Sequence, residues 1–121
     1  MRAVMNSTKK NYSIYVIELN PKVLNIKKFR DKNPDFIAGK PCVYVGYTSK
    51  TPEERFAEHK VGMRKGSLRW HNPYAKKFGM RLKPRLFKHQ NDQKMTQQEA
   101  IDMEIEKARR LRKRGYAVWQ N

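Results

Sequence analysis

The sequence predicts a single domain of the α+β class, built from one chain of 121 residues. Three observations predict this class. Short runs rich in β-branched and aromatic residues indicate strands, two helices begin with capping boxes, and the length suits one compact core. No repeat or change of composition divides the chain, so we expect one domain over residues 1–121, with residues 1–10 flexible.

The first half of the chain predicts two strands with a helical element between them. Residues 11–19, NYSIYVIEL, predict the first strand. Residues 21–32 begin with a proline after an asparagine, which favours a helix start. A loop with two prolines and a glycine follows over 33–41, and residues 42–47, CVYVGY, predict a buried second strand. The two strands are far enough apart in sequence to pair in either sense.

The second half predicts helices with marked ends. Thr51 and Glu54 form a capping box, and Pro52 occupies the first position of a helix that we expect over 52–61. Thr96 and Glu99 form a second capping box. The remaining expectations are a short helix over 72–80, a third strand over 81–89, a long helix over 96–113 that stops before Gly115, and an apolar tail over 116–121 that packs on the core.

Cysteine content and hydropathy narrow the class of protein. The lone Cys42 excludes an internal disulfide and lies in an apolar run, where it fits a small buried residue. The longest apolar run is too short to cross a bilayer, and the N-terminal residues lack the apolar stretch of a signal peptide. We therefore expect a cytoplasmic protein without a membrane partner.

The net charge of +17 points to a polyanionic partner. From Lys60 to Asn91 there are ten lysines and arginines and no acid. Nucleic acid is the leading partner, because phosphate neutralisation releases counterions; a solvated surface is the alternative. The expected contact residues are Lys60, Arg64, Lys65, Arg69, Trp70, His71, Lys76 and Lys77. Trp70, His71 and Tyr74 could stack on bases, although packing in the core or loops also explains them.

A carboxylate interrupts the apolar side of the last helix. That side comprises Ala100, Ile101, Met103, Ile105, Ala108 and Leu111, and Glu104 falls in its middle. A core-facing carboxylate must be paired, protonated or bound to a metal. A salt bridge to an arginine and a functional role are equally good explanations.

Polar groups suited to phosphodiester hydrolysis accompany Glu104. Arg55 and His59 are four residues apart and share one side of a helix. Tyr15 and Tyr44 lie on the two predicted strands. A cation on the carboxylate would polarise a phosphate, an arginine would hold its oxygens, and a tyrosine or histidine would manage the proton of the attacking water.

These residues resemble the motifs of the GIY-YIG nuclease superfamily. The resemblance rests on Ser13-Ile14-Tyr15 and Tyr44-Val45-Gly46, followed by Arg55, His59, Glu104 and Asn121, and spans about residues 11 to 121. It implies a three-stranded antiparallel sheet flanked by helices and a metal-dependent endonuclease acting on DNA. The long separation of the two tyrosines implies an inserted helical element at about residues 20 to 40.

The resemblance also implies a role for each residue. Tyr15 and Tyr44 would handle the attacking water, Arg55 and His59 would act on the phosphate, and Asn121 would help to order the site. Glu104 would be the sole protein ligand of Mg²⁺ or Mn²⁺, with water and phosphate completing the shell. Selectivity would come from a partner protein or a second copy of the chain.

Two other functions compete with the nuclease. A binding module that keeps the fold but does not cut explains the charge, yet has little need of Glu104 on an apolar side. A basic protein associated with RNA or ribosomes likewise explains the charge and leaves Glu104 unexplained. Dependence of activity on a divalent cation separates the nuclease from both.

Overall fold

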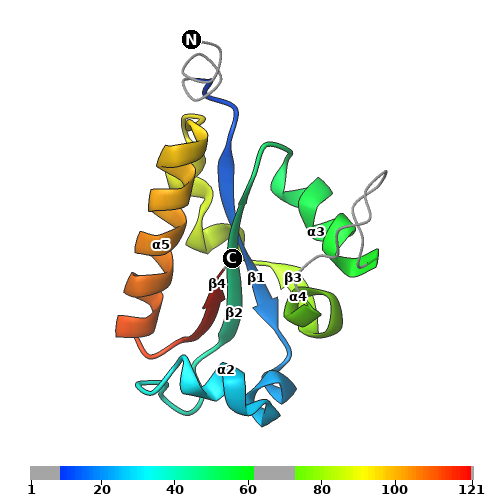
Figure 1. The fold of residues 1–121 in the computed structure, drawn as a ribbon, viewed down its shortest axis with the longest axis vertical. Coiled ribbons are helices and arrows are strands. Elements are labelled where there is room, and N and C mark those ends of the chain that lie inside the picture. Colours follow the sequence, from blue (N-terminus) through cyan, green and yellow to red (C-terminus); the bar gives the residue numbers. More distant parts are fainter. Residues whose placement is uncertain (1–8, 62–72, 121) are drawn as a thin grey trace.

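A four-stranded mixed sheet runs through the middle of the molecule (Figure 1). The computed structural model describes residues 9–61 and 73–120. The strands are β1 (Ser13–Leu19), β2 (Cys42–Thr48), β3 (Gly79–Leu82) and β4 (Ala117–Gln120), in the order β3-β1-β2-β4. β1 is antiparallel to both β2 and β3, whereas β4 is parallel to β2. The α+β class is confirmed, and the first two strands pair in the antiparallel sense.

The expected sheet of three antiparallel strands is wrong, because the C-terminal tail adds β4. Residues 117–119 are apolar and follow the turn at Gly115, whose φ of 91° suits glycine. The helix before this turn leads the chain back along the sheet, so the tail joins β2 in parallel. Asn33 adds to the attachment, since its side chain accepts a hydrogen bond from the N–H of Val118 and donates one to its carbonyl.

The third strand, expected over residues 81–89, begins and ends earlier in the chain. β3 covers only Gly79–Leu82, and Pro84 then begins the 3₁₀ helix η2 (Pro84–Leu86). Proline cannot donate to a strand ladder, which explains why the strand stops here. A further 3₁₀ helix, η3 (Lys88–Asn91), completes the segment.

Between β1 and β2 the predicted helix over 21–32 forms as two short pieces. These are the 3₁₀ helix η1 (Pro21–Asn25), with Asn20 accepting a cap hydrogen bond, and α2 (Lys27–Asp31). Ile26 between them is extended, with ψ of 117°, and breaks the helix. The helical element expected at about 20 to 40 is therefore present but divided.

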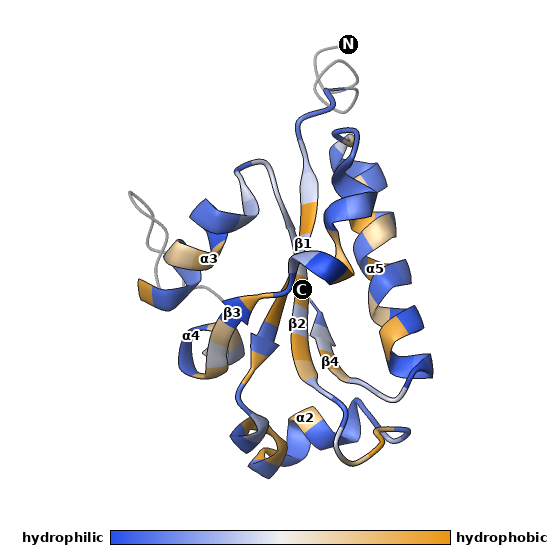
Figure 2. Cartoon of the chain, turned by 180° about the vertical axis from the view of Figure 1, so that it is seen from behind, coloured by the Kyte–Doolittle hydropathy of each residue, from blue (hydrophilic) through white to orange (hydrophobic). Residues whose placement is uncertain are grey.

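The other helices follow the predicted signals. α3 (Pro52–Val61) begins at the Thr51–Glu54 capping box, and α5 (Gln97–Lys113) begins at the box formed by Thr96 and Glu99. α4 (Pro73–Phe78) is shorter than the expected helix over 72–80, because Gly79 already belongs to β3. Figures 1 and 2 show α5 on one side of the central strands, α3 and α4 on the other, and α2 at one end.

The core lies along the strands, where Figure 2 shows most of the hydrophobic residues. β1 and β2 contribute nine of the nineteen buried hydrophobic residues of the described chain, Cys42 among them. On α5 the buried residues are Ala100, Glu104, Ala108 and Leu111. Ile105, expected on this side, is 50% exposed, because the buried stripe is narrow and an adjacent residue lies about 100° around the helix. Within the described ranges, the helices are all too short or too polar to span a membrane.

Candidate functional site

The pairing of β1 with β2 places the two motif tyrosines on one face of the sheet. Tyr15 lies opposite Gly46, and Tyr44 lies opposite Ile17, so the tyrosines are diagonal neighbours. Their ring centroids are 6.1 Å apart. Both side chains are buried, with 0% and 1% exposure. The antiparallel register therefore brings together two residues that the sequence separates.

Gly46 gives the Tyr15 ring its position. A Cβ atom at residue 46 would lie 2.5 Å from the Tyr15 hydroxyl oxygen and 2.6 Å from Cζ. Such a contact is too short for any side chain, so the ring can lie across β2 only where β2 has a glycine. The glycine of the Tyr44-Val45-Gly46 motif thus has a steric purpose here.

His59 reaches the tyrosines from α3. Its Nε2 atom is 2.8 Å from the Tyr15 hydroxyl in a buried hydrogen bond. The imidazole ring also lies edge-on to Tyr44, with centroids 5.3 Å apart. His59 is fully buried on the inner side of α3, beside both tyrosines.

Arg55 lies one turn before His59 and is anchored by an acid that our sequence analysis missed. The Arg55 guanidinium donates to Glu58 Oε1 at 3.2 Å, and their side chains are 12% and 14% exposed. Lys50 forms a second ion pair with Glu58. Burial raises the pKa of Glu58, but hydrogen bonds from Lys50 and Arg55 outweigh it, and the pKa falls below its usual value. The i,i+3 spacing of Arg55 and Glu58 is the signal that would have found this pair.

Glu104 acts on the same tyrosines from α5. Its side chain is 2% exposed, as expected from its place on the buried stripe. Burial raises the pKa of Tyr15 to about 12, with Arg55 lowering it and the charge of Glu104 raising it. Burial also raises the pKa of Tyr44 well above its usual value, and the charge of Glu104 adds to the increase. Both hydroxyls are therefore protonated at neutral pH, in the fields of one cation and one carboxylate.

The last expected site residue, Asn121, lies outside the described residues. β4 pairs with β2 as far as Gln120, which is opposite Val45. The described part of the strand therefore ends one residue along β2 from Gly46, the residue over which Tyr15 lies.

The expected nucleic-acid contacts are only partly described. Arg64, Lys65, Arg69, Trp70 and His71 lie outside the described residues. Lys60 is exposed, but its ammonium group donates to the carbonyls of Lys76 and Gly79, at 3.2 and 2.7 Å, and so links α3 to the next two elements. Lys76 and Lys77 are exposed on α4, where they can meet a polyanion.

Tyr74 packs inside the protein rather than standing free for base stacking. Its ring lies edge-on to Trp119 at 4.7 Å and to Phe29 at 5.8 Å between centroids. Phe29 and Trp119 are themselves stacked at 6.2 Å. This aromatic cluster joins α2, α4 and β4, and it supports the packing explanation for Tyr74.

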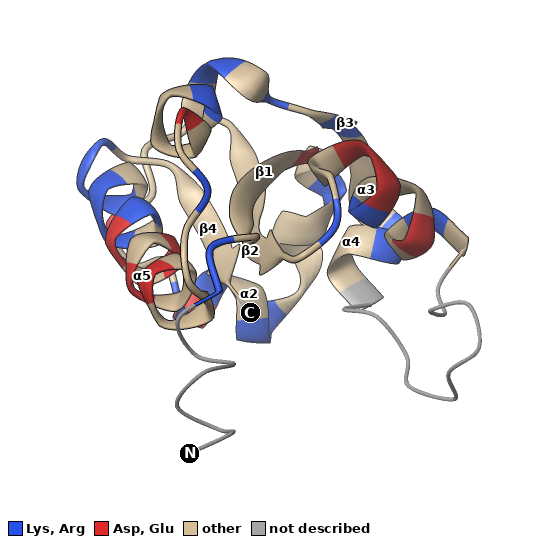
Figure 3. Cartoon of the chain, turned by 90° about the horizontal axis from the view of Figure 1, so that it is seen from above, with Lys and Arg blue, Asp and Glu red and all other residues tan. Residues whose placement is uncertain are grey.

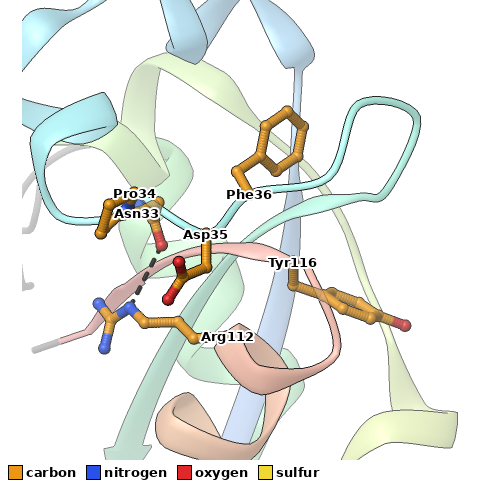
Figure 4. Close-up of a pocket in the computed structure, with 6 residues that line it drawn as sticks. All are labelled: Asn33, Pro34, Asp35, Phe36, Arg112 and Tyr116. Carbon is orange, nitrogen blue, oxygen red and sulfur yellow. Dashed lines mark hydrogen bonds between the residues drawn. The ribbon is translucent and has the colours of Figure 1, made fainter.

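A small pocket lies behind β4, where α5 meets the loop that follows α2 (Figure 4). In Figure 4 the Arg112 guanidinium points at the Asn33 side chain, and its Nε donates to Asn33 Oδ1 at 3.2 Å. Another nitrogen of Arg112 donates to the Val118 carbonyl at 2.9 Å. Two of the polar residues that line this pocket, Asn33 and Arg112, thus hold β4 in place, which is a structural role.

Glu104 is the carboxylate of the cluster around Tyr15 and Tyr44 and the residue that could hold a cation. Residues 9–61 and 73–120 contain no group of three or more His, Cys, Asp or Glu side chains that could hold a metal. That composition does not fit a tetrahedral zinc site. Mg²⁺ needs no such group, because it keeps several waters and takes one or two carboxylates. Glu104, the carboxylate beside the tyrosines, is the residue that would hold such a cation.

No family model matches the chain, and neither a curated protein nor a solved structure matches it.

Proposed function

We propose that this protein is a divalent-metal-dependent endonuclease that hydrolyses DNA phosphodiester bonds with a GIY-YIG-like site. The observation that carries the proposal is the buried Tyr15–His59 hydrogen bond of 2.8 Å, with Tyr44 in ring contact and the charges of Arg55 and Glu104 acting on both tyrosines. This set combines a cation for phosphate, a carboxylate for a metal and a proton relay. The positive net charge supplies attraction to the polyanion.

The tyrosines would orient the attacking water rather than deprotonate it as standing bases. A pKa of about 12 leaves almost no tyrosinate on Tyr15 at neutral pH. The Tyr15 hydroxyl and His59 Nε2 are 2.8 Å apart. In the neutral tautomer protonated on Nδ1, Nε2 would accept a hydrogen bond from this hydroxyl, which would make the Tyr15 oxygen a better acceptor for a hydrogen bond from water. His59 is then the group that takes up proton density as the water attacks.

Arg55 would bind the scissile phosphate and stabilise the charge that develops on its oxygens. The Glu58 carboxylate orients the guanidinium from one side, so less side-chain freedom is lost when a phosphate binds. Glu104 would hold the cation, which when bound supplies Lewis-acid stabilisation of the phosphate charge.

Burial of the cluster favours the second candidate, a nucleic-acid-binding protein that does not cut. Tyr15, Tyr44, His59 and Glu104 are at most 2% exposed. A phosphate reaches them only if neighbouring side chains move, whereas binding through exposed lysines needs no such movement. Salt-sensitive binding of DNA that ignores divalent metal, with no cleavage, would support this second function.

Cleavage of supercoiled plasmid in Mg²⁺ by the wild type and by Glu104→Gln distinguishes the nuclease from the binding protein that does not cut. We expect a loss of roughly 100-fold or more, because the carboxylate that holds the cation is gone. Asp102→Asn is the matched control, since Asp102 is exposed on the same helix, and it should keep full activity. A folded Glu104→Gln protein that cuts as fast as the wild type would overturn the mechanism.

A further inference from the structure

The C-terminal half of α5 carries a charge pattern that the proposed site does not use. From residue 107 to 114, six of eight residues are Lys or Arg and none is acidic. The two others, Ala108 and Leu111, are buried in the core. Figure 3 shows the basic residues toward one end of α5 and the acids toward the other. Every position of this segment that does not face the core is therefore basic.

Three of these residues form one row along the helix. Lys107, Arg110 and Arg114 follow the i, i+3, i+7 spacing that places side chains on one side. Burial lowers the pKa of Lys107, and the charges of Arg110 and Arg114 lower it further, which shows that the row is crowded with like charge. The helix dipole favours cations in the last turn, which includes Arg110, but Lys107 lies upstream of that turn.

The loop before β2 extends this row with a fourth cation. Lys40 Nζ and the Arg114 guanidinium lie 5.7 and 5.6 Å from the centroid of the Tyr116 ring. Two backbone hydrogen bonds fix the loop against the end of α5: Ile37 N–H to the Gly115 carbonyl at 2.9 Å, and Ala117 N–H to the Pro41 carbonyl at 3.1 Å. We call Lys107, Arg110, Arg114 and Lys40 the basic row.

Glu106, an acid near the basic row, is already shared by two arginines. Glu106 accepts hydrogen bonds from both Arg109 and Arg110, and these arginines lower its pKa to about 2. A single carboxylate therefore faces two guanidinium groups, and the surface keeps an excess of positive charge. Such an excess, on a rigid helix, suits a linear polyanion with regularly spaced charges.

We infer that the basic row is a DNA-contacting surface separate from the hydrolytic cluster, and that it binds backbone phosphates beside the bond to be cut. Arg114 is ten residues beyond Glu104, or about 15 Å along the helix. That distance corresponds to roughly four base pairs of duplex. The inference deepens the proposed function by adding a contact surface, but it needs only DNA binding and not cleavage.

Duplex binding in EDTA tests the row apart from catalysis. The protein is Glu104→Gln throughout, so cleavage plays no part. Adding Lys107→Gln, Arg110→Gln and Arg114→Gln should weaken binding roughly ten-fold or more at low salt, and should lower the slope of log K against log salt by about 2 to 3. Gln matches Arg and Lys in helix propensity, and circular dichroism with a thermal melt checks the fold.

A matched triple variant separates a specific surface from general charge. Lys9, Lys22 and Lys28 are exposed and lie outside both the basic row and the stretch from Lys60 to Asn91, and changing all three to Gln removes the same charge. Equal weakening by both triples would overturn the inference. Glu106→Gln releases Arg109 and Arg110 and should strengthen binding several-fold; unchanged or weaker binding would contradict it. Binding to vesicles of anionic phospholipid is measured with the same variants. If the basic-row triple weakened vesicle binding but left DNA binding unchanged, the basic row would be assigned to a membrane surface instead.

Discussion

The Tyr15 hydroxyl lies 2.8 Å from Nε2 of His59, in a hydrogen bond that joins β1 to α3 across 44 residues of sequence. Both groups are fully buried. A buried polar pair costs desolvation unless the bond is made, so its presence fixes how α3 sits on the sheet.

Tyr15→Phe removes the hydroxyl and keeps the ring. We expect the free energy of unfolding to fall by about 1 kcal/mol or somewhat more, because a polar atom of His59 loses its buried partner. Plasmid cleavage in Mg²⁺ should fall ten-fold or more, since Tyr15 is the group proposed to orient the attacking water. Tyr12→Phe is the control: Tyr12 is half-buried against Tyr47, outside the cluster, and its loss should leave cleavage unchanged. Equal cleavage by both variants would remove Tyr15 from the mechanism.

Glu58→Gln tests whether the carboxylate positions Arg55. The variant loses the charge that holds the guanidinium, so we expect DNA cleavage to fall several-fold, with a larger part of the loss in kcat than in KM. Arg55→Ala should lose more than ten-fold of the cleavage rate, because it removes the proposed phosphate contact itself. Glu53→Gln, an exposed acid on the same helix, should have no effect. A Glu58→Gln enzyme with wild-type kcat would show that Glu58 is only structural.

Much of the candidate site could be predicted from sequence because its signals are local. A capping box fixes where α3 begins and hence which side carries Arg55 and His59. The position of Glu104 among small residues predicts its burial, and the structure confirms it. The burial of Ile105 was mispredicted, since periodicity alone does not tell how wide the buried stripe is.

The parts that were missed depend on contacts distant in sequence. The sequence over 116–121 is too short to show whether the tail forms a strand or only packs on the core. Its parallel pairing with β2 depends on where α5 ends relative to the sheet. The Asn33 side chain holds β4 through hydrogen bonds to the backbone of Val118, which is 85 residues away in sequence, and no local pattern predicts this contact. The helix break at Ile26 could not be predicted either, because Ile26 is neither a proline nor a glycine.

Gly46→Ala tests the steric purpose of the glycine. Its Cβ would lie 2.5 Å from the Tyr15 hydroxyl oxygen, so the ring must move and the bond to His59 is lost. We expect a loss of about 1 to 3 kcal/mol in urea unfolding, together with loss of cleavage. The double variant Tyr15→Ala/Gly46→Ala removes the clash, so its cost should be less than the sum of the two single costs. Strict additivity would show that the two residues do not press on each other.

Alkaline pH should destabilise the protein through the buried tyrosines. The pKa of Tyr15 is raised from 10.0 to about 12, so between these values the unfolded chain has released the proton that the folded chain still holds. Stability therefore stays constant with respect to this group below pH 10 and falls as pH rises toward 12, by roughly 2 to 3 kcal/mol in total. Tyr44 acts in the same direction, since its pKa is also raised.

Urea midpoints measured from neutral pH upward test this linkage. Tyr15→Phe should give a shallower decline above pH 10, because one of the two raised groups is gone. Glu104→Gln should also decline less steeply, since the Glu104 charge raises the pKa of both tyrosines and its removal lets them ionise more readily in the folded state. Declines identical to that of the wild type in both variants would mean that neither the Tyr15 proton nor the Glu104 charge governs the alkaline limit.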